Sequence, residues 1–143
     1  MANNISFVGK IRKIKDGYSE QTAREYIDGN AYLLPIEGIW QSSDGYNYAI
    51  EKDVDDKGRR ITNQFRMIVL ESSFDGWSVG QIKGFIQFGS VDNIYSMKYY
   101  TRMANGSNTS TQQVILVQES PILLSFNRVD GGKIALYKLY PQV

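Results

Sequence analysis

Eight short segments rich in β-branched and aromatic residues follow one another along most of the chain, and turn signals separate them. The breaks between the segments are rich in Gly, Asp, Asn and Ser, as in "SDGYN" and "DDKGR". Strands at such even spacing, with no helical segment between them, predict an antiparallel meander in which neighbours in sequence pair. The segments span residues 37–43, 46–53, 60–72, 81–89, 94–103, 112–119, 122–129 and 133–140.

Apolar and polar residues alternate within these segments. Tyr46 and Tyr48 share one side of the second segment, and Met97 and Tyr99 share one side of the fifth. A period of two indicates that one face of each strand contacts a core while the other contacts water. Eight such strands avoid exposed edges if the sheet closes, so we predict a mostly-β fold: an eight-stranded antiparallel up-and-down barrel. A barrel of this size is filled by side chains or holds one small ligand.

One helix signal precedes the strands, in "SEQTAREYIDGN" at residues 19–30. Ser19 is suited to cap the helix N-terminus, but Thr22 stands where a capping box usually has Glu, so we expect the box to be incomplete. Ala23 and Ile27 belong to one narrow apolar face. We predict a helix at about 19–28 within an N-terminal lead-in of residues 1–34, followed by a barrel domain of residues 35–143.

A Gly-x-Trp motif, Gly38 and Trp40 in "IEGIW", opens the first predicted strand. With eight antiparallel strands after it, the motif resembles the lipocalin-like (calycin) architecture. The resemblance implies that Gly38 lets the strand bend at the closed end of the barrel and that Trp40 plugs this end. It also implies that a basic side chain from a late strand stacks on the Trp40 ring. Arg128 is the expected residue, and Lys138 is the alternative.

More narrowly, "IEGIW", "SDGYNYAIEKD" and "GQIKGFI" resemble a small β domain of uncharacterised bacterial proteins. That domain often lies downstream of trypsin-like peptidase domains. The resemblance spans residues 35–141 and implies a fold and a context as an accessory domain of a larger protein, without an active site.

The absence of His and Cys excludes many kinds of chemistry. No histidine base, Ser–His–Asp triad, thiolate nucleophile, disulfide or His–Cys metal site can form. The segment from Asp53 to Gln64 begins like a calcium loop, but Lys57 stands at its fifth position and Gln64 at its twelfth, where an acid is needed. We therefore expect a hairpin turn there, no metal, no cofactor and no catalytic residue, and we predict that the protein is not an enzyme.

Charge and hydropathy limit the partners. The 16 basic and 15 acidic residues leave a net charge of +1, without the basic excess that nucleic-acid binders need. The sequence has no run of 18 apolar residues, so no membrane-spanning helix is predicted. The N-terminal residues lack the pattern of a signal peptide, which leaves a cytoplasmic protein and a fragment of a secreted or periplasmic one both open.

The chain has ten Tyr, six Phe and two Trp, and large aromatic side chains with polar tips are common in the walls of binding sites. The leading hypothesis is a non-catalytic module that binds a small apolar or amphiphilic ligand in the barrel or at its mouth. The alternative is a packed accessory domain that contacts a protein partner or another domain of its parent chain. For the first hypothesis, the expected ligand-binding residues are Tyr48, Arg66, Phe85, Met97, Tyr99 and Arg102.

Overall fold

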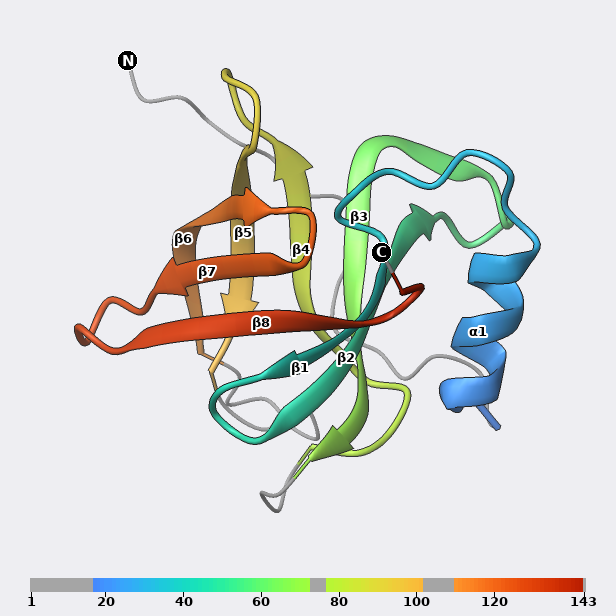
Figure 1. Ribbon diagram of the computed structural model, residues 1–143, viewed down its shortest axis with the longest axis horizontal. Helices are drawn as coiled ribbons and strands as arrows, with labels where there is room; N and C mark the ends of the chain where they lie inside the picture. The colour runs from blue at the N-terminus through green and yellow to red at the C-terminus, as the bar shows by residue number, and fades with distance from the viewer. Residues whose placement is uncertain (1–16, 73–76, 102–109, 143) are drawn as a thin grey trace.

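A computed structural model describes residues 17–72, 77–101 and 110–142 of the chain (Figure 1). In these ranges each strand pairs antiparallel with the next, and β8 pairs with β1, so the sheet closes into an eight-stranded barrel. The predicted up-and-down barrel with one N-terminal helix is confirmed. Its elements are α1 (Glu20–Asp28), β1 (Gly38–Ser42), β2 (Tyr46–Val54), β3 (Arg60–Ser72), β4 (Ile82–Phe88), β5 (Ile94–Tyr100), β6 (Thr111–Ser120), β7 (Leu123–Asn127) and β8 (Lys133–Tyr140).

The core lies inside the barrel, where side chains from strands that are not neighbours meet. The ring of Tyr99 on β5 lies 4.9 Å from the ring of Phe126 on β7. At the middle of β4, a Cβ atom on Gly84 would lie 3.3 Å from the sulfur of Met97 and 3.4 Å from Cε of Met67. Side chains from several strands therefore meet in the middle of the barrel.

Helix α1 packs against the barrel through one face. Ala23 and Ile27 are buried and belong to the same apolar cluster as the barrel interior. The Ser19 hydroxyl accepts from the amide of Thr22, and the Thr22 hydroxyl accepts from the amide of Ser19. The capping box is thus complete, contrary to the sequence expectation, because a threonine hydroxyl reaches the cap amide as a Glu side chain would. The helix confirms the predicted span, and the division into a lead-in and a barrel domain stays a prediction.

The two ends of the barrel differ (Figure 1). At one end, here called the helix end, β1 begins, β8 finishes and α1 docks: the guanidinium of Arg24 lies 4.3 Å from the ring centroid of Tyr140. The opposite end, here called the turn end, carries the β1–β2 turn at residues 43–45 and the β7–β8 turn at residues 128–132. Among the described residues, no helix has the length and apolar composition needed to cross a membrane.

Gly38 and Trp40 occupy the positions that the Gly-x-Trp motif suggested. Gly38 has a φ of +155°, and a Cβ atom there would lie 2.5 Å from the carbonyl oxygen of Tyr140. A larger residue would therefore clash where β1 and β8 close the sheet. The Trp40 side chain is fully buried, and its indole N–H donates to the carbonyl of Ile36 at 3.0 Å.

The basic residue over Trp40 is Lys138 rather than Arg128. The Lys138 ammonium lies 5.0 Å from the Trp40 ring centroid and donates to the carbonyl of Pro35 at 2.7 Å. Lys138 is the register partner of Trp40 across the β1–β8 pair. Arg128 lies in the β7–β8 turn at the turn end and pairs with Asp130 at 3.2 Å. The prediction for Arg128 was wrong because the residue lies beyond the end of β7, away from the start of β1.

Candidate functional site

A β-bulge in β4 turns one lysine into the barrel. Met67 on β3 pairs with Gly84, but the next residue, Ile68, pairs with Ile82, so Lys83 is an extra residue on β4. A bulge of this kind breaks the alternation of side chains along a strand. Simple alternation from Gly84 would place Lys83 on the outer face, whereas the structure brings its ammonium among interior rings.

Three aromatic rings surround the Lys83 ammonium; these four residues are here called the Lys83 cage. The nitrogen lies 4.1 Å from the ring centroid of Tyr99, 4.9 Å from that of Tyr46 and 4.8 Å from that of Trp77. The rings come from β5, β2 and the segment before β4. The ammonium also donates to the carbonyl of Tyr100 at 2.8 Å, and Lys83 is only 2% exposed.

The Lys83 side chain is a buried cation without a carboxylate partner. Within the described ranges, its ammonium has one hydrogen bond and three cation–π contacts, and it forms no ion pair. Aromatic faces compensate only part of the free energy that a buried charge loses on leaving water. Burial lowers the pKa of Lys83 to about 8, while Asp44 raises this pKa and Arg128 lowers it by smaller amounts.

Tyr48 brings a second incompletely satisfied polar group to the same region. Its ring stacks on that of Tyr46, with centroids 5.4 Å apart and planes 10° apart. The side chain is 1% exposed, and its hydroxyl makes no hydrogen bond of good geometry with the described residues, although the Tyr99 hydroxyl interacts with it and contributes to its raised pKa. Burial raises the pKa of Tyr48 well above its usual value, so the phenol stays protonated and keeps a hydrogen to donate.

The residues predicted to bind a ligand lie on two different faces of the sheet. Tyr48, Met97 and Tyr99 are buried in the interior, Met97 against the mid-barrel position of Gly84. For these three, ligand contact stays a prediction. Arg102 lies outside the described residues.

Arg66 and Phe85 are register partners on the outer face of the sheet, and ligand contact for these two residues also stays a prediction. Arg66 is next to Met67, and Phe85 is next to Gly84, and both of these neighbours face inward. Consecutive residues of a strand face opposite sides of the sheet, so Arg66 and Phe85 face outward. Phe85 is buried and meets the ring of Tyr100 edge-on at 6.2 Å.

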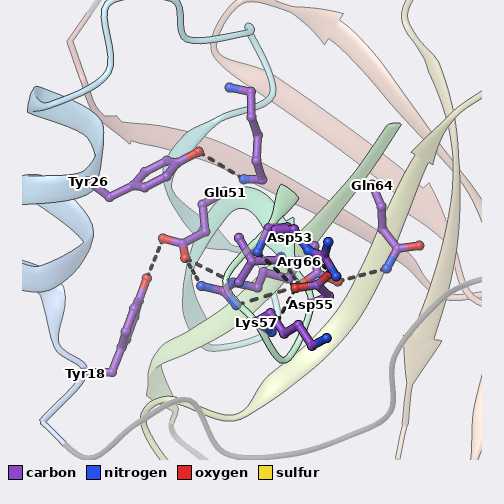
Figure 2. A network of polar contacts seen from close by, with 11 residues as sticks. Tyr18, Tyr26, Glu51, Asp53, Asp55, Lys57, Gln64 and Arg66 are labelled. Carbon is purple, nitrogen blue, oxygen red and sulfur yellow. Dashed lines mark hydrogen bonds and ion pairs between the residues drawn. The ribbon is translucent and has the colours of Figure 1, made fainter. Parts of the chain in front are cut away.

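Arg66 belongs to a polar network between β2, β3 and the segment that leads into α1 (Figure 2). Its guanidinium donates to one carboxylate oxygen of Glu51 at 2.6 and 3.0 Å, and the Tyr18 hydroxyl donates to the other at 3.0 Å. Asp53 accepts from Gln64 at 2.8 Å and lies 3.7 Å from Arg66. Both carboxylates are buried and paired, so this network joins the lead-in of the helix to the barrel wall.

A separate polar cluster is centred on Glu37 at the helix end. The fully buried carboxylate of Glu37 accepts from the Tyr26 hydroxyl at 2.6 Å, from the amide of Leu34 at 3.0 Å and from the ammonium of Lys52. Burial, with the hydrogen bond to Glu37, raises the pKa of Tyr26. Every oxygen of this carboxylate has a donor, which indicates a structural role in fixing α1 and the start of β1.

The calcium-like segment forms the β2–β3 turn. Asp55 accepts from the amides of Lys57 and Arg59 at 2.9 Å, an arrangement that closes a tight turn. Among residues 17–72, 77–101 and 110–142, no three potential metal ligands converge.

The sequence pattern did not predict that Lys83 and Trp77 are neighbours. Strand alternation grouped Lys83 with the outer residues, and Trp77 lies in the turn segment between two predicted strands. One signal was present, because Gly84 directly follows Lys83 and a glycine inside a strand often marks a bulge. That signal indicates the break in alternation but does not identify the rings that meet there.

The fold and this site together define a closed antiparallel barrel with a buried lysine near one end. Comparison of the chain with protein-family models, with curated proteins and with solved structures found no match.

Proposed function

We propose that this protein is a non-catalytic binding module that holds a small amphiphilic ligand at the turn end of its barrel. The single observation that carries the proposal is the Lys83 cage: a buried ammonium, one backbone acceptor and three aromatic faces. Binding sites of this type are mostly apolar and have a few placed polar groups. The Tyr48 hydroxyl supplies a second polar group without a partner in the described chain.

The packing of the barrel interior favours the turn end over the middle. Side chains of Met67 and Met97 already meet around Gly84, and Trp40 fills the interior toward the helix end. A ligand in the middle would need these side chains to move, whereas a ligand at the Lys83 cage would meet polar groups with unused hydrogen-bonding capacity. The proposed ligand therefore places its polar end at Lys83 and its apolar body among the rings.

The architecture also supports a finer proposal, that the domain is a lipocalin-like (calycin) barrel. Support comes from Gly38 at the start of β1, the buried Trp40 and a basic side chain, Lys138, stacked on that tryptophan. Within this proposal the protein serves as a ligand-holding domain of a larger bacterial, peptidase-associated chain.

The test uses mass spectrometry of the purified protein under native and denaturing conditions, with titration of an apolar fluorescent probe on the same sample. We expect either a small molecule that is lost on denaturation or one saturable probe site, and weaker probe binding in Lys83→Met. Lys98→Met is the matched control, because Lys98 lies on the neighbouring strand against the outer-face ring of Tyr100. A clean mass without saturable probe uptake would contradict ligand binding.

A second candidate function is a packed accessory domain that binds a protein partner. It is favoured by apolar side chains exposed on the outer surface of the barrel, among them Ile115 on β6 and Tyr137 and Leu139 on β8. Tyr137 and Leu139 are two residues apart and so project from the same side of β8. Loss of partner binding in Tyr137→Ser, with unchanged probe binding, would separate this function from the first.

A further inference from the structure

We propose that Lys83 captures a carbonyl compound covalently: its amine forms a reversible imine with an aldehyde whose apolar or aromatic body lies among the rings of the cage. This inference rests on the proposed function, because it names the chemistry of the ligand at the same site. It extends that function from non-covalent holding to covalent capture.

The first support is the position of the amine. A side-chain amine needs to be free of carboxylates and shielded from water to act as a nucleophile toward a carbonyl carbon. Lys83 forms no ion pair within the described ranges and is 2% exposed. One of its hydrogens is directed to the carbonyl of Tyr100, and the faces of Tyr46, Trp77 and Tyr99 lie around it.

The second support is the change in charge that the reaction brings about. A protonated Lys83 holds a buried positive charge that no ion pair among the described residues balances, and Asp44 offsets only part of the effect of burial. Imine formation starts from the neutral amine, so the ammonium first releases a proton to solvent, and the unprotonated imine that forms is neutral and avoids the unfavourable free energy of a buried charge. The same environment that disfavours the ammonium therefore favours the product.

The bonds and protons balance without an oxidant or a reductant. The lone pair of the neutral Lys83 nitrogen attacks the aldehyde carbon and forms a C–N bond, which gives a carbinolamine. The carbinolamine then loses its oxygen as water, which carries away both hydrogens of the amine, and a C=N bond remains. The protonated Tyr48 hydroxyl, without a partner among the described residues, is a donor beside the cage for the carbonyl oxygen.

The charged and titratable groups around Lys83 come from several elements. Tyr46 and Tyr48 lie on β2, Tyr99 lies on β5, Asp44 lies in the β1–β2 turn and Arg128 lies in the β7–β8 turn. Burial lowers the pKa of Lys83 to about 8, Asp44 opposes this shift and Arg128 adds to it. At pH 7 the neutral fraction of Lys83 then exceeds that of an ordinary lysine by on the order of 100-fold.

The experiment is reductive trapping of the intact protein with benzaldehyde and sodium cyanoborohydride, followed by peptide mapping. The chain has eight other lysines, which serve as internal references in the same sample. We expect a benzyl group on Lys83 at a rate at least about tenfold above that of each other lysine at pH 7, since neutral amine is the reacting form. The rate at Lys83 should level off above about pH 8.

Two variants control the result. Lys83→Arg keeps the cation in the cage but cannot form an imine, so the fast labelling should disappear while circular dichroism confirms the fold. Lys98→Met removes an amine from the outer face of the neighbouring strand and should leave the labelling of Lys83 unchanged.

Even labelling of all lysines, or an unlabelled Lys83, would overturn the covalent inference. Saturable binding of benzyl alcohol, which cannot form an imine, would then show that the non-covalent proposed function survives. Failure of both labelling and alcohol binding would overturn both proposals.

Discussion

Replacing Lys83 with Met should change how the stability of the protein depends on pH. Methionine keeps an unbranched apolar side chain of similar length among the rings but has no titratable group. The folded protein lowers the pKa of Lys83 from 10.5 to about 8. Between these two values the unfolded chain binds more protons than the folded one, so the Lys83 contribution makes the wild-type protein more stable as pH rises.

The magnitude follows from the same shift. A difference of about 2.5 pH units, at about 1.4 kcal/mol per unit, corresponds to about 3 kcal/mol. Below about pH 8 the amine is charged in both states, and the full unfavourable contribution of the buried ammonium is present. As pH rises toward 10.5 this contribution disappears, and the wild-type protein gains about 3 kcal/mol relative to Lys83→Met.

The assay is urea unfolding of both proteins at several values between about pH 6 and about pH 10.5, with the difference in unfolding free energy plotted against pH. Tyr18, Tyr26, Tyr48 and Tyr99 have raised pKa values, so ionisation of the unfolded chain lowers stability above pH 10. These tyrosines are common to both proteins and cancel in the difference. A difference constant to within about 0.5 kcal/mol over the whole range would refute the assignment of Lys83 as a buried, unpaired amine.

Three further substitutions test particular contacts by urea unfolding. Tyr48→Phe removes a buried hydroxyl without a described partner, so we expect an unfolding free energy that is unchanged or about 1 kcal/mol higher. An unfolding free energy lower by about 1 kcal/mol would show instead that the Tyr48 hydroxyl forms a stabilising hydrogen bond. Gly38→Ala should lower the unfolding free energy by about 1–3 kcal/mol, because the alanine Cβ would lie 2.5 Å from the carbonyl oxygen of Tyr140. An unchanged unfolding free energy would contradict this close approach of β1 and β8. Arg66→Met leaves Glu51 buried without its cation and should cost about 3–5 kcal/mol, part of which Glu51→Gln in the same chain should restore.

Much of the fold could be predicted from the sequence because strand length, turn composition and alternation all indicate the same arrangement. The predicted segment 60–72 is β3 residue for residue, and 133–140 is β8. The Gly-x-Trp motif also placed Trp40 correctly in the core. These features depend on local patterns, which one sequence displays directly.

The candidate site was less predictable because it depends on contacts between strands. A bulge opposite Met67 shifts the register of β4 by one residue and moves Lys83 across the sheet, and no periodic pattern reports such a shift. Likewise, Arg128 and Lys138 are both basic residues late in the chain, and only the β1–β8 register decides which of them reaches Trp40. The partners of Arg66 come from β2, which the pattern within β3 cannot reveal.

The antiparallel order of the barrel determines where other domains can be attached. With an even number of strands, β1 starts and β8 finishes at the same end, beside α1. A domain joined after β8 would therefore be tethered at the helix end. Such a tether would lie at the end of the barrel opposite the β1–β2 and β7–β8 turns, so its linker would not cross the turn end, where we propose that the ligand binds.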